Sequence, residues 1–457
     1  MITVQKIHQN KVRTRDFVKE MLPLAIPVAA HEFLMSMVHI VDTIMVGTIN
    51  DTAIAAVSLA NQFFFVFILM MIGICSGSAI FIAQYFGDKD TKGIHRTIGF
   101  TLLLTVLSGT AFAVAAVNFA EPIISFYTSD PAVIESGVAY LQITGFTYPL
   151  IALLIAYGTV LRTIHKAKIP LVVSIFALSI STGLNFVFIF GHLGFPAMGV
   201  EGAALATLFA RLFELALLFA IMRARKSIAL APIKNLFAFP HGFIKKFAIT
   251  NYPVLLNEMG WVLGTTLFNK IYASICTQGF TSLVVANTIF SVFFVIFFGT
   301  SSATAIMIGN KIGENKLALA SEYARIVHKL VIISSVVLGI LMALGSSVFP
   351  MIYGLHGETL RTATIILIIY AIALPFRSFN LHTVNGILRS GGDTKFGMAM
   401  DLVGVWLIGL PMALFANQVL GLPLIWVLIF ALSEEPIKAA VGFWRVRKGK
   451  WINRVIG

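Results

Sequence analysis

Charged residues are scarce in this chain. Only 12% of its 457 residues are Asp, Glu, Lys or Arg, whereas 58% are hydrophobic, and the mean hydropathy is +0.91. Soluble globular proteins carry about 25% charged residues. The composition therefore excludes an ordinary soluble fold, and no hydrophilic stretch is large enough to form a soluble domain.

Cysteine is nearly absent. Cys75 and Cys276 are the only two, and we place both within apolar spans. They do not provide a disulfide framework for an extracellular domain, so we expect them to pack between helices. Residues 1–16 are polar and basic, and no small-residue cleavage site follows the first apolar run, which favours a retained span over a signal peptide.

Long apolar runs recur throughout the chain. A helix needs roughly 20 apolar residues to cross about 30 Å of hydrocarbon. We count twelve such runs, at 18–46, 54–85, 97–118, 134–160, 168–190, 199–222, 247–275, 281–310, 325–350, 360–388, 395–415 and 423–445. The sequence therefore predicts an all-α integral membrane protein with twelve transmembrane helices.

Positive charge is concentrated in alternate loops. The net charge of +13 comes from Lys and Arg groups near 6–15, 89–96, 162–168, 223–246, 311–316, 389–395 and 445–454. The intervening loops carry mostly acids, such as Asp51, Glu121 and Asp130, with Arg361 as the basic exception. Because basic loops stay in the cytoplasm, both termini are predicted to be cytoplasmic. The protein itself is predicted to lie in the cell inner membrane. The charge indicates topology, so no nucleic-acid partner is expected.

The two halves of the chain repeat the same pattern. With a shift of 226 residues Pro27 falls on Pro253 and Glu32 on Glu258, and the repeat continues as far as Gly87 on Gly313. Further along, with a shift of 227, Leu161-Arg162 falls on Leu388-Arg389. We divide the chain into an N-lobe (1–222), a cytoplasmic linker (223–246) and a C-lobe (247–457). Two pseudo-symmetric six-helix lobes of the same orientation are typical of transporters that expose a central site alternately to each side.

The first span carries an unusual number of polar residues. An ionisable side chain at the bilayer centre costs about 2.5–3.5 kcal/mol, so each one needs a partner, a wet cavity or a function. At about 100° per residue, His31, Met35 and Asp42 share one helix face, and Glu32 and His39 extend that stripe. The stripe suits a water-filled cavity that accepts protons and contacts a bulky amphipathic ligand. The alternative is a network of hydrogen bonds between helices.

Asp42 is the strongest candidate for binding a coupling cation. A partly desolvated carboxylate can load and release a proton. It can equally bind Na⁺ if Asn61, Ser181 and Asn185 supply oxygen ligands, in which case Asp42 and Asn185 are the metal ligands we expect. The sequence leaves the choice of H⁺ or Na⁺ open, and also the alternative that Asp42 is a residue at the outer end of its helix.

The second half contains further ionisable residues within its spans. Glu258 can attract a cationic substrate or hold a second proton, or it can pair with Arg377 or Lys270. Arg377 requires either a charge partner or an anionic group. We interpret the others as structural: Asp401 as a helix cap, Arg211 with Glu214 as an i, i+3 pair, and Glu434, Glu435 and Lys438 near the end of the last span.

Four segments taken together resemble the multidrug and toxic compound extrusion (MATE) family. They are Val41-Asp42-Thr43-Ile44-Met45-Val46-Gly47, Ala55-Ala56-Val57-Ser58-Leu59-Ala60-Asn61, Gly199 to Thr207, and Leu388-Arg389-Ser390-Gly391-Gly392-Asp393-Thr394-Lys395. The resemblance covers nearly the whole chain and includes features of the NorM and DinF branches. It implies a twelve-helix antiporter that exports cationic and amphipathic drugs in exchange for H⁺ or Na⁺. It also implies that Asp42 binds the coupling cation in the N-lobe, with Asn185 as a polar partner.

Two positions depart from the family pattern. NorM-type members place the seventh-span acid about one turn further from the proline than Glu258, where this chain has Trp261. The tenth-span acid is replaced around Arg377 and Ser378. The resemblance therefore implies coupling through the N-lobe. We expect the substrate cavity to be lined by His31, Glu32, Met35, His39, Glu258, Trp261 and Arg377.

The partners that we expect follow from this interpretation. They are small organic cations or amphipathic drugs and membrane lipids, handled by a monomer without cofactors other than the coupling ion. The nearest rival is a lipid-linked oligosaccharide flippase of the same superfamily, in which Arg377 would bind a pyrophosphate, but intramembrane Arg and Lys are scarce. A membrane enzyme is not expected, because His31, Glu32 and His39 match no metal motif.

Overall fold

The computed structural model describes residues 13–456, and the side chains of this range except those of residues 36–44. The first half contains α1 (Thr14–Gly47), α2 (Asp51–Gly87), α3 (Thr91–Asn118), α4 (Ala120–Ser125), α5 (Pro131–Gly145), α6 (Tyr148–Thr163), α7 (Lys168–Phe190), α8 (Gly199–Ala224) and α9 (Ile233–Leu236). The second half contains α10 (Phe243–Ile275), α11 (Thr277–Gly313), α12 (Leu317–Leu344), α13 (Phe349–Ile352), α14 (Gly357–Leu381), η1 (His382–Leu388), α15 (Thr394–Val403), η2 (Gly404–Gly409), α16 (Leu410–Leu414), η3 (Phe415–Val419), α17 (Leu424–Leu432) and α18 (Glu434–Arg447), where η denotes a π-helix.

Over the described residues these helices form twelve long segments, which confirms the predicted all-α, twelve-span fold. Eight helices are long and apolar enough to cross a membrane, or nine if the bent pair α5 and α6 is one span. The remaining segments are α1, α10 and the pair α17 and α18. Polar residues such as Asn257 and Glu258 make α10 less apolar, and the break at Ser433 divides the last span into the short helices α17 and α18.

Several spans differ from the predicted bounds or are bent or interrupted, among them the ninth and the fourth. The ninth was expected at 325–350, but α12 begins at Leu317, because Tyr323 and Ala324 in its charged first turns are buried against the C-lobe core. The fourth span is bent by 50° between α5 and α6. Pro149 follows this bend; proline lacks the N–H of a regular helix and restricts the residue before it.

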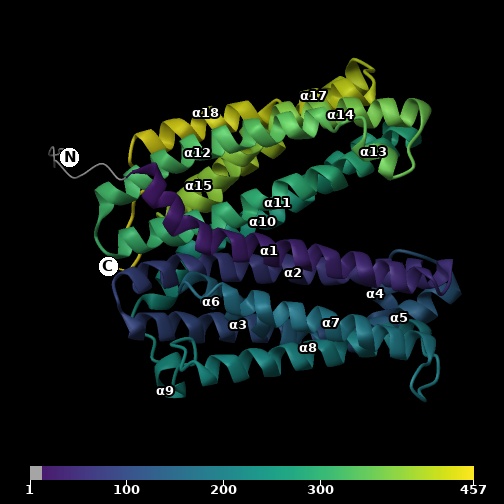
Figure 1. Cartoon of the computed structure of the whole chain (residues 1–457), viewed down its shortest axis with the longest axis horizontal. Coiled ribbons are helices and arrows are strands. Elements are labelled where there is room, and N and C mark those ends of the chain that lie inside the picture. The colour runs from purple at the N-terminus through teal and green to yellow at the C-terminus, as the bar shows by residue number, and fades with distance from the viewer. Residues whose placement is uncertain (1–12, 457) are drawn as a thin grey trace.

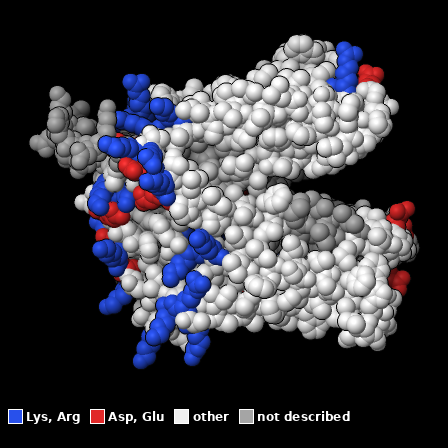
Figure 2. Space-filling model, in the orientation of Figure 1, with Lys and Arg blue, Asp and Glu red and all other residues white. Residues whose placement is uncertain are grey.

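The chain forms two lobes that lie side by side (Figure 1), with α1 to α8 in one and α10 to α18 in the other. Helix α1 packs against α11, and α2 packs against both α10 and α11. Lys and Arg gather at one end of the molecule, which we call the basic end (Figure 2). The lobes meet near this end, and a deep hollow between them opens toward the opposite end.

Close backbone contacts join the lobes at the basic end. A Cβ atom at Gly87 would collide with the carbonyl oxygen of Asn310, and one at Gly313 would collide with that of Gln84. Gly87 and Gly313 are repeat mates, and so are Gln84 and Asn310, because 310 − 84 = 313 − 87 = 226. The sequence repeat therefore produces two equivalent contacts across the interface, each of which requires a glycine.

Introducing a methyl group at this contact will destabilise the protein. We expect Gly313→Ala to cost about 1–3 kcal/mol, because backbone atoms of α2 must move to accommodate the new carbon. The matched control is Gly183→Ala in α7, where a Cβ meets nothing within 4 Å. Thermal unfolding in detergent measures both. Equal midpoints for the two variants would show that the contact between α2 and α11 is not tight.

The turn after α6 adds a polar contact across the same interface. His165 Nε2 and Asn310 Nδ2 lie 2.5 Å apart, and the imidazole ring stacks on Phe86. Burial lowers the pKa of His165, so the ring is neutral at neutral pH and can accept a hydrogen bond from the amide.

The chain after α18 crosses the basic end of the interface. Trp451 is fully buried, and its indole Nε1 donates to the carbonyl of Val446 at 3.1 Å. Beyond it, Gln84 of the N-lobe donates to the carbonyl of Asn453 at 3.1 Å and accepts from the N–H of Val455 at 2.8 Å. Gln84 also donates to the carbonyl of Ser390 at 3.0 Å. Within the described part of the chain, the Gln84 side chain therefore bonds to groups of the other half.

Candidate functional site

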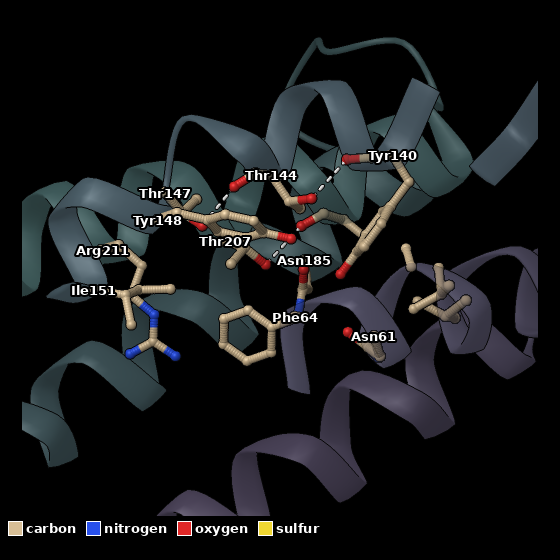
Figure 3. A pocket seen from close by; sticks show the side chains of 14 residues that line it. Asn61, Phe64, Tyr140, Thr144, Thr147, Tyr148, Ile151, Asn185, Thr207 and Arg211 are labelled. Carbon is tan, nitrogen blue, oxygen red and sulfur yellow. Dashed lines mark hydrogen bonds between the residues drawn. The ribbon is translucent and has the colours of Figure 1, made fainter. Parts of the chain in front are cut away.

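A cavity of about 70 Å³ lies inside the N-lobe (Figure 3). Its polar lining residues come from five helices and the bend between α5 and α6: Asn61, Tyr140, Thr144, Thr147, Tyr148, Asn185, Thr207 and Arg211. A buried water needs about 10–15 Å³ of such volume, so the cavity has room for a few waters or an ion. Sites for drug-sized ligands are usually about 300–1,000 Å³. The N-lobe cavity therefore suits an ion better than a drug.

The hydroxyl groups of this cavity present oxygen lone pairs. Thr144 donates its hydroxyl hydrogen to the carbonyl of Tyr140 at 2.9 Å, and Thr207 donates to that of Ala203 at 3.0 Å. Figure 3 shows Asn185 and Thr207 close together, with the Asn61 side chain of α2 also lining the cavity. Because the hydroxyl hydrogens are used within the helices, the remaining lone pairs can accept hydrogen bonds or bind a hard cation.

Arg211 does not make this cavity cationic. Its Nη1 lies 2.6 Å from Glu214 Oε2, and Ser174 donates to Glu214 Oε1 at 3.1 Å. The predicted i, i+3 pair is confirmed. Glu214 therefore neutralises the guanidinium at the edge of the cavity.

A smaller cavity of about 20 Å³ adjoins the first, with Thr207 and Arg211 lining both. Met35 of α1 and Ser181 of α7 line the smaller one. The structure thus brings Asn61 and Asn185 to one cavity and Ser181 and Met35 to its neighbour. Sequence reasoning missed Tyr140, Thr144 and Thr207 as cavity residues, although Thr207 ends the small-residue segment that begins at Gly199.

Two of the predicted residues, His39 and Asp42, have side chains outside the described residues. The backbone of α1 is helical through both positions. On either side of them, Met35 lines the smaller cavity and Val46 lines the larger one.

Glu32 and Glu258 form equivalent ion pairs in the two lobes. Glu32 Oε1 lies 3.7 Å from Arg162 Nη1, with His31 Nδ1 at 3.8 Å, and Glu258 Oε1 lies 2.7 Å from Arg389 Nη2. The acids are repeat mates, and so are the arginines. Each pair joins the first helix of its lobe to the end of the fourth span, which accounts for Glu32. The partners that we considered for Glu258, Arg377 and Lys270, were wrong.

The second pair is more buried and also crosses the interface. The side chains of Arg389 and Glu258 are 7% and 17% exposed, against 19% and 43% for Arg162 and Glu32. Arg389 Nη1 donates to Ser76 Oγ of α2 at 3.1 Å. Arg389 therefore binds both lobes at once.

Arg377 also has a partner within the protein. Its Nε lies 3.6 Å from Glu435 Oε1, and its guanidinium lies 4.6 Å from the ring centre of Phe290. The structure thus provides both a carboxylate and an aromatic face for this charge. Trp261, in α10, is 46% exposed.

Two structural interpretations need correction. Asp401 lies well inside α15, where it accepts a hydrogen bond from Asn257 Nδ2 at 3.1 Å, so it is not a helix cap. Cys75 is buried as predicted, but Cys276 is exposed at the junction between α10 and α11. The predicted spans 247–275 and 281–310 end and begin on either side of this junction, so the exposure of Cys276 agrees with the span boundaries but not with packing between helices.

Two six-helix lobes that meet at one end and separate at the other are typical of membrane transporters. The sequence profile of the MatE family matches residues 27–187 and 253–415, one segment in each lobe. The chain belongs to the MATE family of transporters, which confirms the resemblance seen in its motifs.

Similar proteins cover almost the whole chain. The uncharacterized transporter YisQ of Bacillus subtilis (strain 168) is 26% identical over 440 residues, 94% of each chain. The probable multidrug resistance protein NorM of Thermotoga maritima is 22% identical over 439 residues, 96% of this chain and 94% of its own. The fold matches a solved structure of the outward-facing conformation of a multidrug resistance MATE family transporter with a TM-score of 0.85 and 16% identity, covering 97% and 100% of the two chains.

Proposed function

We propose that this transporter is a multidrug efflux antiporter of the cell inner membrane, which exports cationic or amphipathic organic compounds in exchange for H⁺ or Na⁺. The observation that carries the proposal is the oxygen-lined N-lobe cavity, which is sized for an ion and lies in a lobe that faces the central hollow. The name of the Thermotoga maritima relative, a probable multidrug resistance protein, supports the substrate class.

Position 42 is the proposed site of the coupling cation. At about 100° per residue, it falls within about 40° of both Met35 and Val46 on α1, and these two residues line the adjoining cavities. Asn61, Asn185 and Thr207, which line these cavities, are the oxygen ligands that we propose beside a carboxylate at this position. Such a set can hold a proton on the carboxyl group, or Na⁺ among the oxygens.

Alternating access is the proposed mechanism. The positive-inside rule assigns the basic end to the cytoplasm, with both termini there, so the hollow would open outward. Cation binding in the N-lobe would favour release of an organic cation from the hollow. Rocking of the lobes would then open the basic end and return the cavity to the cytoplasm.

The ion pairs favour this proposal over an oligosaccharide flippase. A flippase would need free cations to bind a pyrophosphate, but Arg377 faces Glu435, Arg389 faces Glu258 and Arg211 faces Glu214. Each of these guanidinium groups already has a carboxylate partner, which would compete with an anionic substrate.

Ethidium efflux from proteoliposomes under separately imposed H⁺ and Na⁺ gradients tests the proposal. We expect wild-type efflux to follow one of the gradients, and Asp42→Asn to reduce it to the rate of protein-free vesicles, because an amide neither binds a proton at neutral pH nor neutralises the charge of Na⁺. The matched control is Asp51→Asn, an exposed acid in the first turn of α2, which should leave efflux unchanged. Export against a gradient by Asp42→Asn at the wild-type rate would overturn the assignment of Asp42. No wild-type efflux under either gradient would overturn drug antiport.

A further inference from the structure

In the C-lobe, two spans lose regular α-helical geometry beside Glu434. The twelfth span breaks at Ser433, between α17 and α18, and Glu434 begins α18. In the eleventh span, Gly404 and Gly409 bound the π-helix η2. A Cβ at Gly404 would lie 3.0 Å from Glu434 Oε2, and one at Gly409 would lie 3.3 Å from Glu434 Cδ. The Glu434 carboxyl therefore lies against η2, and π-helices and helix breaks within the membrane often mark functional sites.

Glu434 belongs to a buried cluster in which acids outnumber bases. Lys438 Nζ lies 3.4 Å from Glu434 Oε1 and 3.6 Å from Glu435 Oε2. Glu435 also pairs with Arg377, and Asp401 is within electrostatic range of Lys438. Arg389 is near Asp401 as well, but it forms its own pair with Glu258. The carboxyl groups of Glu434, Glu435 and Asp401 then face only the two cations of Lys438 and Arg377 within this cluster of described residues. This leaves one negative charge in excess.

The cluster is also short of hydrogen-bond donors. Three oxygens are buried without a hydrogen-bond partner: Glu434 Oε2, Asn257 Oδ1 and Asn380 Oδ1. The corresponding amide nitrogens already donate, that of Asn257 to Asp401 and that of Asn380 to Glu435 at 2.7 Å. A buried acceptor without a donor and a buried charge without a partner are both costly. One added proton reduces both deficits.

The hydrogen bonds indicate which carboxyl group holds this proton. Glu435 receives a hydrogen bond from Asn380 and also faces both Lys438 and Arg377. Asp401 receives one from Asn257 and is only partly buried. Glu434 is 7% exposed and faces Lys438 alone. Because donors and cations favour the ionised form of a carboxyl group, Glu434 is the least stabilised as an anion.

We propose that Glu434 is a proton-binding site of the C-lobe, separate from the N-lobe cavity, with Lys438 and Asp401 as the charges that set its proton affinity. The ligand is a proton and not a metal ion, because the ammonium group of Lys438 occupies the position beside the carboxylates and repels other cations. Tyr272 of α10 lies within electrostatic range of Glu434 as an additional titratable neighbour. The role of Glu434 in coupling rests on the proposed antiport, whereas proton binding by Glu434 does not.

Infrared difference spectroscopy of the purified protein in lipid nanodiscs tests proton binding directly, because a protonated carboxyl group has its own C=O stretching band. At neutral pH we expect this band in the wild type and in Asp42→Asn, and its loss in Glu434→Gln. Asp401→Asn removes the excess charge and should also reduce the band, because Glu434 then ionises. A wild-type band that Glu434→Gln leaves unchanged would overturn the proposal.

Lys438→Gln should change the carboxyl band in the opposite direction. Removal of this cation leaves three carboxyl groups with Arg377 alone, so the cluster should bind one further proton and the carboxyl band should grow. A folded Lys438→Gln protein with a smaller band would contradict the charge count, even if Glu434→Gln failed to fold. Size-exclusion profiles establish which variants are folded.

Transport measurements separate this inference from the proposed function. In vesicles with a proton gradient, Glu434→Gln should export ethidium more slowly than the wild type, and its efflux should depend less steeply on pH. An unchanged pH dependence would exclude Glu434 as a coupling site. If the wild type exports nothing, antiport fails, while the infrared result still decides whether Glu434 binds a proton.

Discussion

Replacing Arg389 with methionine will lower the free energy of unfolding by about 3–5 kcal/mol, because it leaves the Glu258 carboxylate buried without its cation. Methionine retains most of the apolar volume, so the loss reports mainly the charge. The same change removes the hydrogen bond to Ser76 and with it a contact between the lobes. Thermal unfolding in detergent, followed by the fluorescence of the native tryptophans, measures the effect.

The sequence repeat supplies a matched control. Arg162→Met breaks the equivalent pair in the N-lobe, where Glu32 is 43% exposed and the charges are 3.7 Å apart. Exposed ion pairs contribute about 0–1 kcal/mol, so this variant should unfold close to the wild-type temperature. Adding Glu258→Gln to Arg389→Met removes the unpaired charge and should restore most of the lost stability. Equal effects of the two arginine variants, or no recovery in the double variant, would contradict the explanation.

The pair also shows which parts of a membrane fold a sequence reveals. The repeat identified both Glu32 with Glu258 and Arg162 with Arg389 as equivalent positions, since both matches can be read directly from the chain. It did not show that the acids and arginines bind each other, because that depends on how the first and fourth spans of each lobe pack. We therefore expected Glu258 to pair with Lys270 of the same span or with Arg377 of the tenth span.

The twelve spans were predictable because the bilayer imposes a length of about 20 apolar residues on each of them. The departures come from interactions that hydropathy does not measure. The bend before Tyr148 accompanies a proline, and the π-helices η1, η2 and η3 lie within segments whose mean hydropathy is that of a continuous span. Burial of the charged first turns of α12 likewise depends on contacts with other helices.

Some residues of the N-lobe cavity were predicted from the sequence and others were not. Asn61 and Asn185 were recognised because an amide within a span is costly and therefore conspicuous. Thr144 and Thr207 were not, because a threonine hydroxyl can bond to a carbonyl of its own helix and remain inconspicuous in an apolar segment. Asp401 and Glu434 were taken as structural because their excess charge becomes visible only when the neighbouring spans are assembled.

Removal of residues 453–457 will weaken the contact between the lobes at the basic end. It deletes the two hydrogen bonds between Gln84 and the chain at Asn453 and Val455, and an ion pair between Arg454 and Asp88. Trp451 remains, so the C-lobe core into which it packs is preserved. At about 1 kcal/mol for each hydrogen bond, we expect a loss of about 2–3 kcal/mol. That is on the order of a 30- to 150-fold change in the ratio of closed to open forms at this end.

Double electron–electron resonance measures this change as a distance between two spin labels. The labels are attached at Lys92→Cys and Lys316→Cys, in a protein in which Cys75 and Cys276 are replaced by serine. Both lysines lie at the basic end, one near the start of α3 and the other before α12. The truncated protein should gain a longer distance component. The control is Arg454→Ala, which removes only the ion pair, whose side chains are 36% and 40% exposed, and should leave the distances almost unchanged.

Gln84→Leu should lengthen the distances at least as much as the truncation, because it removes both of these bonds from the N-lobe side and also the bond to the carbonyl of Ser390. Agreement between these variants would identify Gln84 and the C-terminal segment as the reversible closure of the basic end. A transporter needs a closure of this strength, since a contact worth a few kcal/mol is large enough to favour one state and small enough for ligand binding to reverse it. Distances in both variants that match the full-length protein would assign the closure to the glycine contacts between α2 and α11 alone.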